Sequence, residues 1–96
     1  MDVGELLKNT ISVFLKGKVD EFVLKINTSL KEDEFKGLTS DHHFDDKHTY
    51  NNDSVTIDEY EYILDGTFEK VLEIEYVKQD DNTIFVFAIK GYVATW

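Results

Sequence analysis

The amino-acid sequence predicts an α+β fold: an antiparallel β-sheet of about four strands, with two helices packed on one face of the sheet. Three observations predict it. Residues 3–16 place apolar side chains at helical spacing, residues 54–94 alternate apolar and polar side chains, and Asp65-Gly66 is a strong two-residue hairpin signal. The chain has 96 residues, which is the length of a single domain spanning 1–96.

The N-terminal segment is expected to be an amphipathic helix. Its apolar side chains fall on one stripe when residues 3–16 are wound as a helix, and Gly17 suits the C-terminal cap. The stripe consists of Val3, Leu6, Leu7, Ile11, Phe14 and Leu15.

The next stretch predicts a strand, a second short helix and a loop. Residues 19–26 alternate apolar and polar side chains as a strand does. Ser29 and Glu32 have the spacing of a capping box, so a short helix is expected to begin there and to end near Gly37. Residues 39–53 are polar and show no periodicity, so we expect them to form a loop.

The second half of the chain predicts two consecutive hairpins. A two-residue turn at Asp65-Gly66 sets a register in which paired residue numbers sum to 131, so Ile57 should face Ile74. The second hairpin should place Ile74 opposite Ile89. Because side chains alternate between the two faces of a sheet, this register decides which residues share a face.

One face of the predicted sheet is apolar and should form the core, whereas the other is acidic and carries tyrosines. Tyrosine provides a large contact area at low entropic cost, so we predict that the acidic face binds a protein partner. The alternative is that these tyrosines only pack along the sheet. The candidate partner-binding residues are Asp58, Tyr60, Tyr62, Glu69, Val71, Glu73, Glu75 and Tyr92.

The charge balance narrows the kinds of partner. Asp and Glu number 20 and the basic residues 10, all of them lysine, which gives a net charge of −10. Proteins that bind DNA or RNA neutralise phosphates with Lys and Arg, so direct nucleic-acid binding is not expected, and anionic membranes would repel the chain. Such a surface favours basic proteins as partners. The alternative is that the charge only keeps a small protein soluble.

All three histidines lie in one short polar segment, Asp41 to His48. A zinc site needs three or four ligands that converge, but His42 and His43 are adjacent and would point in opposite directions in an extended segment. The sequence also lacks cysteine and a nucleophile or phosphate-binding motif. We therefore expect no metal, no cofactor and no enzymatic activity, and a metal-dependent enzyme that uses these histidines is kept as a further hypothesis.

Neither a membrane span nor a secretion signal is expected. No apolar run approaches the roughly 18 residues that indicate a transmembrane helix. The opening residues, "MDVGELLK", contain acidic side chains and no continuous apolar stretch, so the protein is expected to be intracellular.

Taken as an ordered series, these segments resemble a known family. The series is "ELLK…ISVF", "VDEFVLKI", "KEDEF", "TIDEYEY", "LEIEYVKQDDNTIFVFAI" and the aromatic C-terminal end. It resembles the small acidic anti-CRISPR proteins of archaeal rod-shaped viruses, the type I-D inhibitor family, over nearly the whole chain.

The resemblance implies an α+β homodimer that acts early in infection in the host cytoplasm and has no enzymatic activity. Its implied partner is the large subunit of a host CRISPR effector complex, of type I-D or of type III-B. The alternative is an immunity-type or antitoxin-type acidic protein that neutralises a basic nuclease, because both functions require the same charge complementarity.

Overall fold

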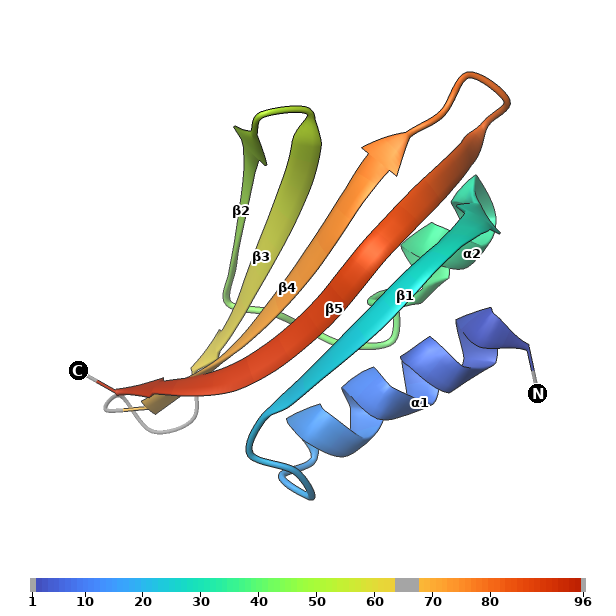
Figure 1. The fold of residues 1–96 in the computed structure, drawn as a ribbon. Coiled ribbons are helices and arrows are strands. Elements are labelled where there is room, and N and C mark those ends of the chain that lie inside the picture. Colours follow the sequence, from blue (N-terminus) through green and yellow to red (C-terminus); the bar gives the residue numbers. More distant parts are fainter. Residues whose placement is uncertain (1, 64–67, 96) are drawn as a thin grey trace.

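Two helices and five strands make up the part of the chain that the computed structural model describes, residues 2–63 and 68–95 (Figure 1). All neighbouring strands are antiparallel, in the order β1-β5-β4-β3-β2. The elements are α1 (Val3–Leu15), β1 (Phe22–Lys31), α2 (Glu32–Gly37), β2 (Asp46–Asn52), β3 (Val55–Ile63), β4 (Phe68–Lys78) and β5 (Thr83–Thr95).

The predicted fold class is wrong in its balance of strands and helices. The sheet has five strands rather than about four, α1 is the one main helix, and α2 has only 6 residues, so the protein is mostly β. The additional strand is β2, which lies in the segment expected to be a loop. Each of its side chains is exposed, so it lacks the alternation of apolar and polar residues that reveals a half-buried strand.

Helix α1 forms as the apolar stripe predicts. The Asp2 side chain accepts a hydrogen bond of 2.8 Å from the backbone N–H of Glu5, which caps the N-terminus. Gly17 has φ 81°, and its N–H donates to the Phe14 carbonyl at 3.1 Å. The Lys70 side chain, only 4% exposed, also donates to that carbonyl, so β4 holds the end of the helix against the sheet.

The predicted capping box at Ser29 and Glu32 is not formed. Ser29 belongs to β1 and pairs with Phe85, and α2 begins only at Glu32. The Glu34 carboxylate instead accepts a hydrogen bond from the backbone N–H of Lys31 at 3.3 Å. Strand β1 is therefore longer than expected, because its last residues pair with β5.

The hairpin of β3 and β4 differs from the predicted register by one residue. Paired residue numbers sum to 132, so Ile57 faces Glu75 rather than Ile74, and Glu59 faces Glu73. An odd number of residues separates each pair, which a two-residue turn cannot produce. The predicted turn at Asp65-Gly66 itself lies outside the described residues. This slip moves the side chains of β3 to the opposite face from the one predicted.

The hairpin of β4 and β5 was predicted correctly around its centre. Ile74 faces Ile89, and Glu73 faces Lys90. A bulge between Glu75 and Tyr76 then shifts the register, so that Tyr76 faces Val86.

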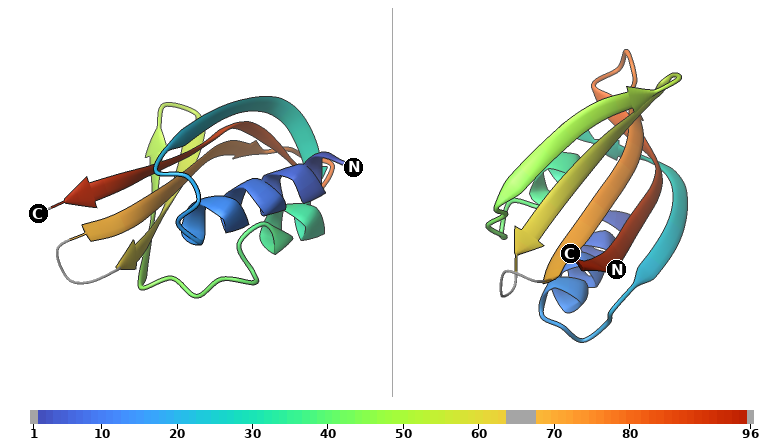
Figure 2. Two further views of the ribbon diagram at one scale, coloured as in Figure 1. Left: turned by 90° about the horizontal axis from the view of Figure 1, so that it is seen from below. Right: turned by 90° about the vertical axis from the view of Figure 1, so that its left-hand side faces the viewer.

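Helices α1 and α2 lie on the same side of the twisted sheet, so no helix of the described residues lies on the other side (Figure 2). We call these two sides the helix face and the open face. The helix face packs against Leu7 and Ile11 of α1 and Phe35 of α2. The buried residues that the sheet contributes to this core are Leu30, Tyr60, Leu72, Ile74, Tyr76, Ile84, Val86 and Ile89.

Within the described residues, neither helix is long and apolar enough to cross a membrane.

Candidate functional site

The open face gathers carboxylates from three neighbouring strands. Side-chain alternation along the strands, together with the observed pairing, places six carboxylates on the open face. Within the described residues, Lys90 is the single lysine that strands β2 to β5 place on it. We call this surface the acidic face. Its carboxylates are Asp46 of β2, Glu59 and Glu61 of β3, and Glu69, Glu73 and Glu75 of β4.

Carboxylates face one another directly on this surface. Glu59 of β3 is the cross-strand partner of Glu73 of β4. Partial burial and then the charge of Glu73 raise the pKa of Glu59. Desolvation and then the charge of Glu61 raise the pKa of Glu69. Neighbouring like charges destabilise a sheet. The carboxylates of β3 and β4 therefore form a negatively charged surface, and a cationic partner would offset their repulsion.

Two tyrosines and one ion pair lie among the carboxylates. The Tyr92 hydroxyl donates to Glu73 at 3.0 Å, and burial together with this contact raises the pKa of Tyr92. Lys90 lies 2.9 Å from Glu75, whose hydrogen bond and charge raise the pKa of Lys90. Tyr50 of β2 is 45% exposed, and Tyr92 is 36% exposed. The acidic face therefore offers aromatic surface to a partner in addition to charge.

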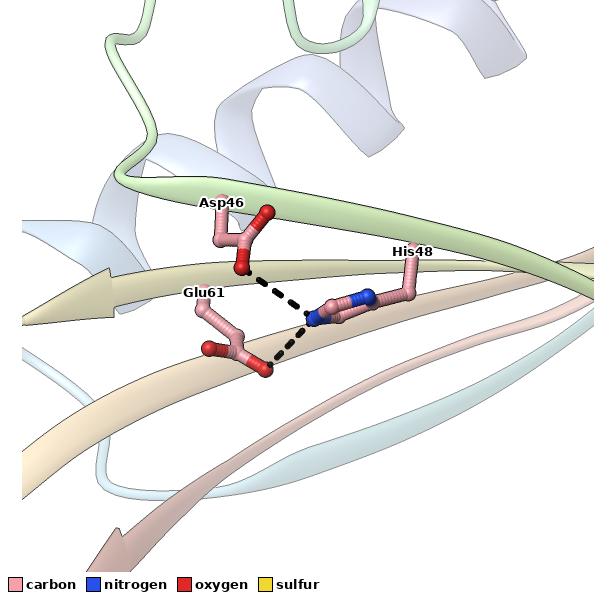
Figure 3. Close-up of side chains that lie close together, drawn as sticks. All are labelled: Asp46, His48 and Glu61. Atoms are coloured by element: carbon pink, nitrogen blue, oxygen red, sulfur yellow. Dashed lines mark ion pairs between the residues drawn. The ribbon is translucent and has the colours of Figure 1, made fainter.

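One end of the acidic face holds a compact cluster of an imidazole and two carboxylates (Figure 3). The His48 Nε2 atom lies 3.3 Å from a carboxylate oxygen of Asp46 and 3.3 Å from one of Glu61. Asp46 and His48 are two residues apart on β2, and Glu61 is the cross-strand partner of Asp46 on β3. One ligand atom from each of the three side chains lies within 4.8 Å of the others.

Three of the predicted partner-binding residues lie on the helix face instead. Tyr60 is part of the core, and its ring centroid lies 4.8 Å from that of Phe44. Tyr62 faces Lys70, whose side chain contacts α1. Asp58 faces Ile74 of the core. The prediction of one shared face for these tyrosines was wrong because it rested on a register that was one residue out.

Asp58 is a structural acceptor on the helix face. Its side chain is 4% exposed and accepts hydrogen bonds from Thr49 at 2.8 Å and from Tyr76 at 3.1 Å, while the Lys47 ammonium lies 3.8 Å away. Burial and then the charge of Asp58 raise the pKa of Tyr76 to about 12. A buried carboxylate with these partners stabilises the position of β2 against β3.

The other five predicted residues, all on β4 and β5, do share the open face. Val71 lies opposite Tyr92 on β5, and its partner on β3 is Glu61 rather than Tyr60, the partner in the predicted register. That these residues bind a partner stays a prediction. The five are Glu69, Val71, Glu73, Glu75 and Tyr92.

The structure does not bring the three histidines together. His42 lies against Phe44, with 6.3 Å between the ring centroids, and Phe44 packs on Tyr60 of the helix face. His48 lies on the open face with Glu61. His43 is exposed before β2 begins. A site made of all three histidines therefore has no geometric basis here.

The two edges of the sheet are β1 and β2. From the sequence, a homodimer is expected to use either the apolar part of the tyrosine-bearing sheet face or an exposed edge at residues 54–64 or 83–94, but β3 and β5 are each paired on both sides. A homodimer formed by edge-to-edge strand pairing would therefore have to use β1 or β2.

Sequence reasoning missed the members of the acidic face on β2 and β3. The sequence predicts a loop for Asp46, His48 and Tyr50, and the predicted register gives Glu59 and Glu61 partners other than the observed ones. The signal that was present is the polar run around Asn52-Asp53-Ser54, which is typical of a turn between two strands. Asp53 indeed has φ 58°, between the paired ends of β2 and β3.

Fold and surface together define a small, mostly β protein with an acidic sheet face that neither helix of the described residues covers. The chain belongs to a family described as "Protein of unknown function (DUF1374)", whose model matches residues 4–93.

Relatives of the chain are proteins of archaeal filamentous viruses. "Uncharacterized protein ORF99" of Acidianus filamentous virus 1 is 37% identical over 94 residues, which cover 95% of this chain and 93% of the relative. "Uncharacterized protein 14" of Sulfolobus islandicus filamentous virus is 28% identical over 88 residues, covering 90% of this chain and 76% of the relative. These relatives support a viral protein family, and inhibition of a CRISPR complex stays a prediction.

Two solved structures have the same fold. The one described as "The thermo- and acido-stable ORF-99 from the archaeal virus AFV1" superposes with a TM-score of 0.87 at 33% identity, over 97% of this chain and 93% of that chain. The structure of ORF14 from Sulfolobus islandicus filamentous virus gives a TM-score of 0.81 at 25% identity, over 99% of this chain and 87% of that chain. The five-stranded topology is therefore that of a viral protein family.

Proposed function

We propose that this chain inhibits a host CRISPR interference complex by binding a basic surface of the complex through the acidic face. The proposed target is the large effector subunit, of type I-D first and of type III-B second, and the place of action is the host cytoplasm. One observation carries the proposal: six carboxylates gather on the open face of the sheet. In the described part of the chain, no helix covers this face, and strands β2 to β5 place only one lysine on it. The viral relatives and the resemblance to anti-CRISPR proteins support the same function.

A nucleic-acid-handling subunit is the kind of partner that this surface fits. Such a subunit presents Lys and Arg to phosphates, and the same residues can pair with a row of carboxylates. Complementary charge speeds encounter and fixes orientation, and Tyr50 and Tyr92 provide the contact area that resists dissociation. Inhibition then needs only occupancy of the basic surface and no catalytic step.

The immunity-type alternative requires the same physics with a basic nuclease as the partner. The relatives from archaeal viruses favour the viral inhibitor. The resemblance also implies a homodimer, which sedimentation of the free protein would test.

The test is capture of purified type I-D and type III-B effector complexes by the protein at low and at high salt. A Glu69→Lys/Glu73→Lys double variant removes charge from the acidic face, and each new lysine lies near a carboxylate of β3, so the fold should be retained. The matched control is Asp20→Lys/Asp80→Lys, which makes the same change of net charge at exposed positions outside the strands.

We expect salt-sensitive capture by the natural chain and the control variant, and loss of capture by the Glu69→Lys/Glu73→Lys variant. Equal capture by both variants would show that the acidic face is not the binding surface. If neither complex is captured at any salt concentration, the assignment of the target is wrong.

A further inference from the structure

We propose that Asp46, His48 and Glu61 bind one divalent transition-metal ion of the zinc class. This inference does not rest on the proposed function, because its argument uses only the geometry of these three side chains, of which Asp46 and Glu61 also belong to the acidic face. It differs from the histidine-only site considered from the sequence, since one histidine combines with two carboxylates from paired strands.

The backbone positions these three side chains for a common ligand. Asp46 and His48 project to the same face because they are two residues apart on β2. Glu61 joins them because it is the cross-strand partner of Asp46 (Figure 3). Ligands on paired strands are held more precisely than ligands on a loop, because the hydrogen-bonded ladder fixes their spacing.

The observed separations are close to those of a metal site. Zinc binds nitrogen and oxygen at about 2.0–2.2 Å, so neighbouring ligand atoms of a tetrahedral site lie about 3.4 Å apart. The Nε2 atom of His48 already lies 3.3 Å from an oxygen of Asp46 and 3.3 Å from one of Glu61. All three atoms lie within 4.8 Å of one another, so the carboxylate oxygens need only move closer together to complete the set.

The donor set selects the class of metal. Calcium takes six to eight oxygen ligands, and magnesium prefers an octahedral shell rich in oxygen and water. One imidazole with two carboxylates suits zinc, cobalt and related ions. The three side chains are 57%, 53% and 22% exposed in the order Asp46, His48 and Glu61, so the fourth position of a tetrahedral ion would face solvent.

The surrounding charge also favours a cation. Glu59 is the cross-strand partner of His48, and Glu69 lies diagonally across from Glu61 on β4, two residues from its direct partner Val71. The carboxylates at this end of the acidic face repel one another. A divalent cation bound among them would offset this repulsion. The competing explanation is a simple ion pair of protonated His48 with the two carboxylates, which requires no metal.

Calorimetric titration of the full chain, without a polyhistidine tag, with zinc chloride in a non-chelating buffer separates the two explanations. We expect one zinc ion per chain, and affinity lowered about tenfold or more by His48→Gln and also lowered by Glu61→Gln. His43→Gln is the matched control, because His43 is exposed and lies outside the cluster. Calcium chloride at the same concentrations should give no binding.

The proposal is overturned if His48→Gln binds zinc as the natural chain does, or if His43→Gln weakens binding equally. It is also overturned if the natural chain binds no zinc. Circular dichroism of each variant confirms the fold, and the Glu61→Gln titration provides a second test on a different strand.

Discussion

At the scale of single residues, Asp58 and Gly91 show how local chemistry fixes this fold. Asp58 is buried on the helix face, where hydroxyl groups of Thr49 and Tyr76 satisfy it. Gly91 lies where the rings of Phe22 and Phe14 come against β5, and a Cβ atom there would overlap the ring of Phe22. Neither role was readable from the sequence, because each depends on residues far away along the chain.

Replacing Tyr76 by Phe should lower the free energy of unfolding by about 1 kcal/mol at neutral pH, because Asp58 loses a buried hydrogen-bond donor. Denaturant unfolding measures this change. Tyr50→Phe is the control, because Tyr50 is exposed, and a loss as large in the control would refute the role of the buried contact.

The same variant has a signature at alkaline pH. The folded-state pKa of Tyr76 is raised to about 12, above the ordinary value of 10.0. Between these values the unfolded chain loses the phenol proton while the folded chain keeps it, so stability falls as pH rises. Tyr76→Phe should therefore flatten the decrease in unfolding free energy from pH 10 to 12, and an unchanged slope would contradict the raised pKa.

Replacing Gly91 by Ala should lower the free energy of unfolding by about 1–3 kcal/mol, because the added carbon must displace aromatic rings in a packed core. Gly37→Ala is the control, since a Cβ atom at that position meets nothing within 4 Å. Equal thermal stability of the two variants would show that the close approach at Gly91 is absent.

At the scale of elements, the register of the hairpin of β3 and β4 decides the composition of both faces. The sequence predicts helix α1 and its glycine cap, because those signals are local. It also predicts the central pairing of β4 with β5, because apolar and polar residues alternate strongly in both strands. It failed for β2, which is exposed along its whole length, and for the register of β3, which depends on the number of turn residues. The acidic face on β4 could therefore be predicted, but its extension to β2 and β3 could not.

The observed register makes a prediction that the sequence register does not. Glu59 faces Glu73, so Glu59→Lys should create an opposite-charge pair and raise the unfolding free energy by about 0.2–1 kcal/mol at low salt. In the register expected from the sequence, Glu59 faces Leu72, and the substitution would gain nothing from Glu73. A double-mutant cycle with Glu73→Gln measures the coupling, and zero coupling would contradict the observed pairing.

At the scale of the whole molecule, a net charge of −10 is distributed unevenly, since residues 49–96 carry 10 acidic residues and 3 lysines. The observed strand pairing places six of the carboxylates on the open face. In the described part of the chain, both helices lie on the other side of the sheet (Figure 2). Such a surface destabilises the free protein and at the same time favours a basic partner.

Salt should therefore act in opposite directions on the free protein and on its complex. Screening should raise the melting temperature of the free chain and weaken capture of the effector complex. Thermal unfolding over a series of sodium chloride concentrations measures the first effect, and the Glu69→Lys/Glu73→Lys variant should show a smaller increase. A melting temperature that does not respond to salt would contradict the repulsion described here.

The most direct test of the central claim is an NMR measurement of which side chains the target covers. The ring signals of Tyr50 and Tyr92 report on the open face, and the methyl signals of Leu6 and Val13 report on the exposed side of α1. On addition of the effector subunit, the tyrosine signals should shift or broaden, while the α1 methyl signals change less. The opposite pattern would contradict binding through the acidic face.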